Sequence, residues 1–151
     1  MDANDWIGRQ AADVQPLLTT LDQRVRRAGP SLAVSESGGM LVYGPFRYRY
    51  DSGREGSSAL VSVAVRKGGV SIYVNSVRDD GTYVAEARAA ALGKVKVGRS
   101  CITVKKAGDL NLDELERVVV EAVERGGAGE VRDPDGRSAS QARRSDSGGI
   151  S

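Results

Sequence analysis

The sequence predicts an α+β fold in which an antiparallel sheet, a β-meander, packs against N-terminal and C-terminal helices. Two observations carry this prediction. Near both ends of the main apolar region, apolar residues recur at the spacing of one helical face. Between them lie runs in which apolar and polar residues alternate, separated by short glycine-containing turns, which is typical of antiparallel strands.

The two terminal helices have clear boundaries in the sequence. The first is expected over residues 16–28, with a proline in its first turn and Gly29-Pro30 after it. The last is expected to begin after Asn111, which can cap it, while Glu114 completes a capping box. Gly126-Gly127 then ends it.

The strands are predicted from residue types that alternate with a period of two along the chain. Residues 46–50, FRYRY, place the aromatic residues on one face and the arginines on the other. Valine-rich alternation continues over residues 60–65 and 70–74 and predicts three consecutive antiparallel strands. A short helix is expected over residues 83–92, and alternation resumes over residues 94–106.

Length and composition predict one domain with a short segment on either side of it. Residues 1–7 are expected to be flexible, residues 8–125 to form a single α+β domain, and residues 126–151 to be a disordered tail. The last segment is rich in Gly, Ser, Arg and Asp and has few large apolar side chains with which to offset the entropy of ordering.

The overall composition argues against several classes of protein. The net charge of +2 gives no strong nucleic-acid signature, and no apolar run is long enough to span a bilayer. The chain has no histidine and one cysteine, which excludes a Cys-His catalytic pair and an internal disulfide. We therefore expect a cytoplasmic protein with no membrane partner and no catalytic constellation.

The segment from Gly93 to Ser100 is one substitution away from a phosphate-binding P-loop, because Arg99 stands where that motif has lysine. A P-loop requires a helix immediately after it. The residues that follow alternate as a strand, so we do not assign a P-loop here.

Basic and aromatic residues on the expected strands and turns form a candidate site for an anionic small molecule or nucleic acid. The candidate ligand-binding residues are Tyr48, Tyr50, Arg54, Glu55, Lys96 and Arg99. The alternative interpretation is that the aromatics serve the core and the cations form a solvated or edge-protecting face.

Carboxylates near the last helix form a second candidate site. Asp109, Asp113 and Glu116 are candidate metal ligands, since a surface that offers only carboxylates suits hard cations and weakly bound ferrous iron. The alternative is a polar helix face whose acidic residues favour the helix dipole.

Three segments together resemble the YdhG-like family of small bacterial domains of unknown function. They are YGPFRYRYDSGREG, LGKVKVGRSCITVKK and DLNLDELERVV, and the resemblance covers roughly residues 14–123. It implies a compact α+β fold and, through one branch of the family, a connection with frataxin-like iron handling. It implies no catalytic residue in this chain.

These observations predict a non-enzymatic intracellular binding protein, with iron handling through surface carboxylates as its first candidate role. The alternative is a module that binds an anionic small molecule or nucleic acid on a basic sheet face. The sequence predicts no cofactor other than iron, and its partners and oligomeric state are open.

Overall fold

The computed structural model describes residues 3–67 and 69–131. The helices are α1 (Ala3–Gly8), α2 (Gln15–Ala28), α3 (Val84–Ala87) and α4 (Leu112–Arg125), with the 3-10 turns η1 (Ala89–Ala91) and η2 (Ala107–Asp109). The strands are β1 (Val34–Ser37), β2 (Met40–Arg49), β3 (Glu55–Arg66), β4 (Gly69–Val74), β5 (Lys96–Val97) and β6 (Cys101–Val104).

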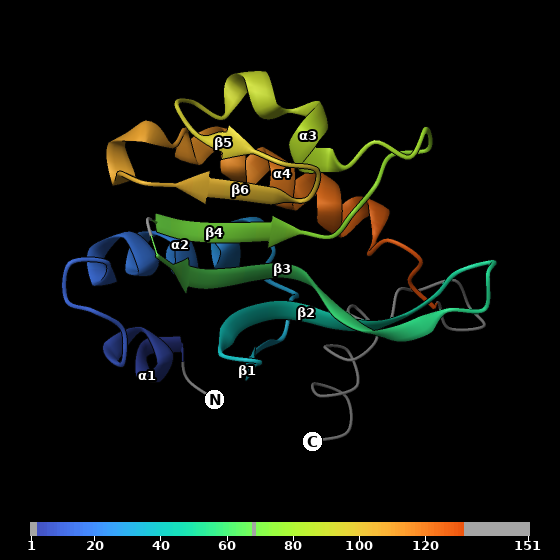
Figure 1. The fold of residues 1–151 in the computed structure, drawn as a ribbon, viewed down its shortest axis with the longest axis horizontal. Coiled ribbons are helices and arrows are strands. Elements are labelled where there is room, and N and C mark those ends of the chain that lie inside the picture. The colour runs from blue at the N-terminus through green and yellow to red at the C-terminus, as the bar shows by residue number, and fades with distance from the viewer. Residues whose placement is uncertain (1–2, 68, 132–151) are drawn as a thin grey trace.

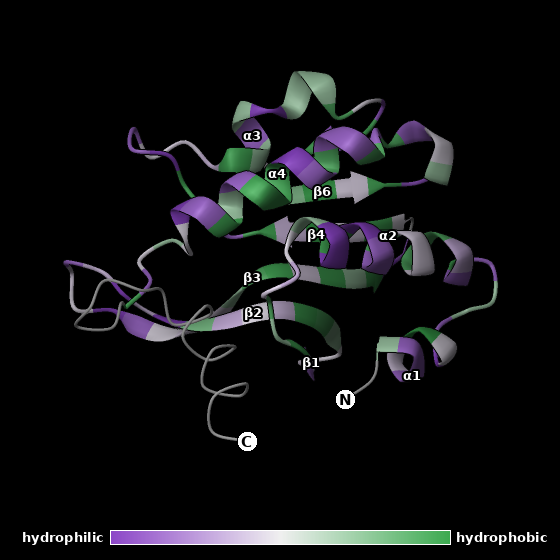
Figure 2. Ribbon diagram, turned by 180° about the vertical axis from the view of Figure 1, so that it is seen from behind, coloured by the Kyte–Doolittle hydropathy of each residue, from purple (hydrophilic) through white to green (hydrophobic). Residues whose placement is uncertain are grey.

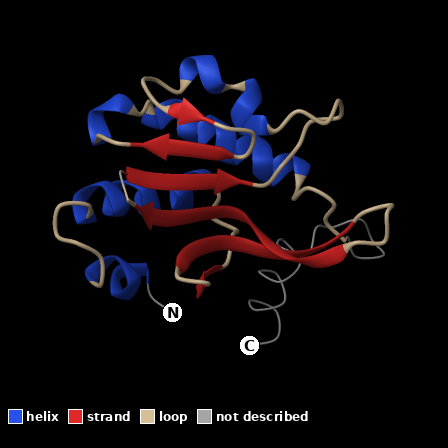
Figure 3. Ribbon diagram, in the orientation of Figure 1, coloured by secondary structure: helices blue, strands red, loops and turns tan. Residues whose placement is uncertain are grey.

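The strands form one six-stranded sheet with the order β1-β2-β3-β4-β6-β5, and every neighbouring pair is antiparallel (Figure 3). The predicted meander of three strands is therefore confirmed as β2, β3 and β4. The longest strands, β2 and β3, continue past the rest of the sheet as a twisted hairpin (Figure 1).

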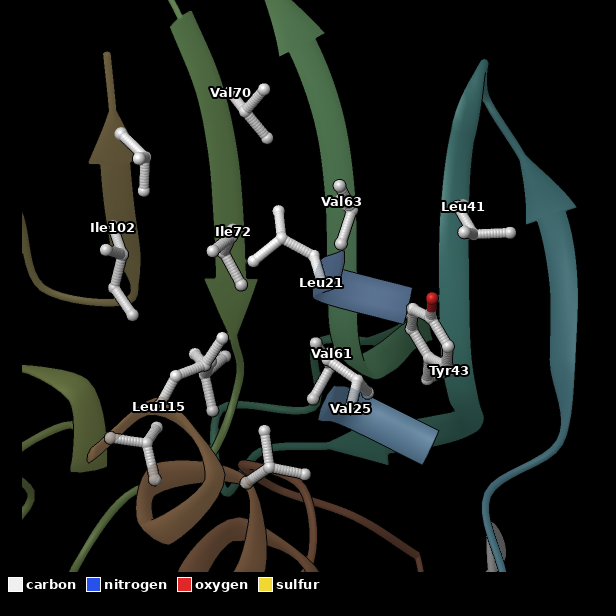
Figure 4. Packing of buried hydrophobic residues seen from close by; sticks show 14 of the residues in the cluster. Leu21, Val25, Leu41, Tyr43, Val61, Val63, Val70, Ile72, Ile102 and Leu115 are labelled. Atoms are coloured by element: carbon white, nitrogen blue, oxygen red, sulfur yellow. The ribbon is translucent and has the colours of Figure 1, made fainter. Parts of the chain in front are cut away.

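Helices α2 and α4 cover one face of this sheet (Figures 1 and 2). The core lies between these helices and the sheet. Leu21 of α2 and Leu115 of α4 pack there with sheet residues such as Val61 and Ile72 (Figure 4). All four of these side chains are fully buried. The apolar periodicity of both helices thus marks their sheet-facing stripes, as predicted.

The predicted cap of α4 is confirmed, because the Glu114 amide donates to Asn111 Oδ1 at 3.1 Å. The capping box is only half formed. The Glu114 carboxylate accepts from Arg88 and Arg117, and the Asn111 amide donates to the Leu92 carbonyl. The expected helix over residues 83–92 is shorter than predicted and splits into α3 and η1.

A strand follows Gly98-Arg99-Ser100, as the alternation predicts. The Gly98 amide donates to the Cys101 carbonyl at 2.8 Å, and the chain turns directly from β5 into β6. The helix that a P-loop requires is therefore replaced by β6.

The N-terminal boundary of the domain lies earlier than expected. Residues 3–8 form α1, and the Trp6 side chain is 1% exposed, with its Nε1 donating to the Gly39 carbonyl at 3.1 Å. Residues 1–7 are expected from the sequence to be flexible, but most of them belong to α1. The sequence pattern also does not identify β1, whose four residues pair with the start of β2.

The C-terminal boundary also changes. Residues 126–131 run beside the second half of β2: the Arg49 amide donates to the Gly129 carbonyl and the Val131 amide to the Arg47 carbonyl, both at 2.8 Å. Gly127 lies against the ring of Phe46 so closely that a Cβ there would collide with it. Residues 126–131, which are expected from the sequence to belong to the tail, therefore pack against the domain, and the rest of the expected tail, residues 132–151, lies outside the described part of the chain.

None of the helices in the described ranges is long and apolar enough to cross a membrane.

Candidate functional site

Three of the six candidate ligand-binding residues line one pocket of about 170 Å³, which we call the tyrosine pocket. They are Tyr48, Tyr50 and Arg54, from the β2–β3 hairpin. The remaining lining comes from β2, β3, the residue after β4, the residue before α3 and the segment after α4: Phe46, Ser58, Asn75, Tyr83 and Ala128.

The local sequence of the hairpin sets the positions of the two tyrosines. Residues two apart on a strand share a face, so the rings of Tyr48 and Tyr50 are neighbours, with centroids 5.2 Å apart and planes tilted by 38°. Tyr48 lies over Gly56 on the paired strand, where a Cβ would approach its hydroxyl to 2.6 Å. The ring of Tyr48 can therefore occupy this position only because Gly56 has no side chain.

The third tyrosine brings a further candidate residue to the site. Tyr83 precedes α3, and the guanidinium carbon of Arg99 lies 5.6 Å from the centroid of its ring. This is within the range of a cation–π contact. Arg99, predicted from a distant part of the sequence, is thus attached to the tyrosine pocket through Tyr83.

Both arginines of this site carry charge that is not neutralised nearby. Arg54 and Arg99 are exposed, and neither forms an ion pair with a carboxylate in residues 3–67 or 69–131. Arginine presents a planar set of donors that suits phosphate and carboxylate groups. The site can therefore offer ring faces and two cations to an anionic ligand.

The other two candidates lie elsewhere. Glu55 accepts from Arg49 Nε at 3.0 Å in an exposed ion pair and does not line the tyrosine pocket. Lys96 is on the edge strand β5, where it lines a separate hollow of about 320 Å³ together with Lys94, Lys105 and Asp109. The structure therefore brings together four of the six candidates.

The candidate metal ligands do not converge. Asp109 lies in η2 beside the lysines of β5, whereas Asp113 and Glu116 project from α4 toward α2. Arg24 donates to both of these carboxylates, at 2.9 and 2.6 Å. No group of three or more His, Cys, Asp or Glu side chains within the described ranges is arranged to hold a metal ion.

Glu116 is further occupied by Arg27, whose Nη2 donates to Oε2 at 2.7 Å. The hydrogen bonds from Arg27 and Arg24 hold the pKa of Glu116 below its ordinary value. The carboxylate is therefore ionised, but a cation would have to displace two guanidinium groups to reach it.

The same pattern repeats along α4. Glu121 accepts from Arg78, Arg125 and Arg88, at nitrogen–oxygen distances between 2.7 and 3.0 Å. These arginines, Arg78 foremost, lower the pKa of Glu121 to about 2. Asp113 and Glu116 of the candidate metal site, and Glu121 on the same helix, thus bind arginines from α2 and the α3 region.

Three residues that line the tyrosine pocket, Tyr83, Asn75 and Ala128, are not predicted from the sequence. Each belongs to a different segment, and only the tertiary fold brings them to the hairpin. For Asn75 the sequence offers a weak signal, because it is a polar residue directly after the apolar strand β4. We find no such signal for Tyr83 or Ala128.

Comparisons with known proteins give no match to a family model, to a curated protein or to a solved structure. The resemblance to the YdhG-like family therefore stays a prediction from the motifs.

Proposed function

We propose that this protein is a non-enzymatic binding module that holds a small anionic molecule in the tyrosine pocket. The ligand carries a flat ring and a phosphate, as a mononucleotide does. One observation carries the proposal. Tyr48, Tyr50 and Arg54 of the hairpin line one pocket together with Tyr83, and Arg99 of the β5–β6 turn lies against the ring of Tyr83.

The two kinds of side chain suit two parts of such a ligand. Stacking of a base on an aromatic side chain is worth about 1–3 kcal/mol, and a guanidinium can bind phosphate with two parallel hydrogen bonds. The pocket of about 170 Å³ is smaller than the roughly 300–1,000 Å³ typical of sites that enclose a ligand. It therefore holds one group of the ligand and leaves the rest outside.

A binding role is favoured over catalysis by the chemistry of the lining. Its residues are aromatic, amide, hydroxyl, arginine and alanine groups, with no carboxylate or thiol among them. The chain also has no histidine. The pocket therefore lacks histidine, carboxylate and thiol groups, which are among the common general acids and bases of enzymes. The single cysteine makes a reducing cytoplasm the setting that we propose.

Iron handling is the weaker candidate, because two of its three predicted ligands already bind arginine. A tight hard-cation site needs several oxygen ligands that face one point. The arrangement of Asp109, Asp113 and Glu116 does not supply such a point.

The proposal is tested by an NMR titration of isotope-labelled protein with uridine monophosphate, uridine and inorganic phosphate. We expect amide shifts confined to the β2–β3 hairpin and the residues around Tyr83. Uridine monophosphate should bind about tenfold more tightly than uridine, since loss of a charged hydrogen bond costs about 1.5–3 kcal/mol.

Variants make the test specific. Arg54→Gln should weaken binding of uridine monophosphate about tenfold. Arg117→Gln, the same change at an exposed position of α4, should leave this affinity unaltered. Tyr48→Ala should weaken binding, and Tyr48→Phe should retain most of it because the ring remains. Shifts spread over α4 instead of the hairpin, or equal binding by both arginine variants, would refute the proposal.

A further inference from the structure

The face of the sheet opposite α2 and α4 has no helix over it in the described part of the chain (Figures 1 and 2). A pocket of about 560 Å³ lies on this open face, and small side chains form much of its floor. Ser35, Val42, Ser62 and Tyr73 lie in register across β1, β2, β3 and β4. We call this pocket the serine groove.

The serine groove adjoins the tyrosine pocket. The two share Ser58 and Asn75 in their linings, and Asn75 Nδ2 donates to Ser58 Oγ at 3.1 Å. This hydrogen-bonded pair is the boundary between them. A ligand that extends out of the tyrosine pocket therefore meets the serine groove next.

The far end of the serine groove is basic. Arg66 lines it, with Nη2 3.5 Å from the hydroxyl of Tyr73, and Lys67 follows at the β3–β4 turn. Residues 69–70 pair with the ends of β3 and β6, so Lys105 and Lys106 come to the same end of the sheet. All four cations are exposed, and none forms an ion pair with a described carboxylate.

We propose that the tyrosine pocket and the serine groove together bind a single strand of nucleic acid; this inference rests on the proposed function. Cations without a described carboxylate partner lie at both ends, and tyrosine rings and hydroxyl groups lie between them. Glu36, the carboxylate in the lining of the serine groove, forms an ion pair with Arg9. The combination of cations, rings and hydroxyl groups fits a chain of phosphates whose bases stack on aromatic rings and form hydrogen bonds with hydroxyls. An acidic peptide would use the cations but would leave the rings without planar partners.

The dimensions suit a short strand. Ser58 and Arg66 are about eight residues apart on β3, roughly 26 Å at about 3.3 Å per residue. Single-strand sites on comparable sheet surfaces cover about 4–16 nucleotides. The groove and pocket therefore accommodate several nucleotides, of which one occupies the tyrosine pocket.

The net charge of +2 does not oppose this assignment, because the charges are not evenly distributed. Carboxylates of α4 are bound by arginines of the helical layer, as described above. The cations of the open face lack such partners within residues 3–67 and 69–131. Charge clustered on one face is what nucleic-acid binding requires.

The test is fluorescence anisotropy of the full chain with labelled oligouridylates of about 2 to 12 nucleotides, measured from about 50 to 200 mM salt. We expect affinity to rise with length until the groove is filled. The logarithm of affinity should fall with that of salt concentration, by about 0.7 for each phosphate contact in a single strand. An acidic peptide of similar charge should bind much more weakly.

Variants on the open face separate this inference from the proposed function. Arg66→Gln should reduce the salt slope by about 0.7 and weaken binding of long oligouridylates only, with uridine monophosphate unaffected. Arg117→Gln is the matched control. Urea unfolding of Arg66→Gln should coincide with that of the wild type, so that the effect is not one of folding.

The possible failures are distinguishable. If uridine monophosphate binds the tyrosine pocket but longer strands gain no affinity, the single-strand assignment is wrong and the proposed function stands. If the acidic peptide binds as tightly as the oligouridylates, the groove is a peptide surface instead. If neither the mononucleotide nor the strands bind, both proposals fail.

Discussion

The two faces of the sheet differ in both packing and charge. On the helix-covered face, aliphatic side chains such as Ile72 are fully buried, and the arginines of α2 and the α3 region bind carboxylates of α4. On the open face, serines and Tyr73 form the surface, and Arg66 has no described carboxylate partner. One face therefore holds the fold together, and the other is left available for a ligand. A balanced total charge conceals this separation.

The largest expected effect comes from two adjacent residues of β4 that point to opposite faces. Ile72→Ala should lower the free energy of unfolding by about 2–5 kcal/mol, because it leaves a cavity in the core. Tyr73→Ala should cost about 1 kcal/mol or less, since its half-buried side chain lies on the open face. Urea unfolding measures both, and equal losses would contradict the difference between the faces.

An intermediate effect is expected at Glu121. Glu121→Gln leaves Arg78, Arg88 and Arg125 without their shared carboxylate and should lower the free energy of unfolding by about 2 kcal/mol. Glu124→Gln, on the exposed side of the same helix, is the control and should change it by less than about 0.5 kcal/mol. If the two variants were equally stable, the arginine contacts would contribute nothing to the fold.

The pH dependence of stability sharpens the same comparison. The pKa of Glu121 falls from an ordinary 4.5 to about 2 in the folded protein, so its contribution is present above pH 4.5 and is lost as the pH falls toward 2. The wild type and Glu121→Gln should therefore converge in stability between about pH 5 and pH 2. A constant difference over this range would show that the charge of Glu121 is not what stabilises the helical face.

The smallest effect is expected on the open face itself. Lys105→Gln should leave the free energy of unfolding within about 0.5 kcal/mol of the wild type, because an exposed cation with no carboxylate partner in the described ranges loses no ion pair. Arg24→Gln on α2, which removes donors to Asp113 and Glu116, should cost more. Thermal unfolding at low salt would detect a reversal of this order.

The period of apolar residues predicts most of the fold, but not its ends. The meander and the cap at Asn111 follow from local patterns that the tertiary structure retains. Helix α1 and the return of residues 126–131 do not, because Trp6 and Gly127 are held by contacts with residues far away in the chain. Such contacts leave no periodic trace in a short segment.

The candidate site shows the same limit. The aromatic alternation predicts that Tyr48 and Tyr50 share a face, but it does not predict that Tyr83 and Arg99 join them. The acidic residues of α4 have the composition of a metal site. Whether a carboxylate is free depends on which arginines fold against it, and here Arg24 and Arg27 belong to a helix much earlier in the chain.

The position of residues 126–131 beside β2 also bears on how the protein is made. A chain that has been synthesised only as far as Arg125 contains every helix and strand of the described ranges, but it lacks Ala128 and the backbone that pairs with Arg47 and Arg49. Proteins emerge from the ribosome N-terminal end first. The segment that completes the lining of the tyrosine pocket is therefore synthesised after all the described helices and strands.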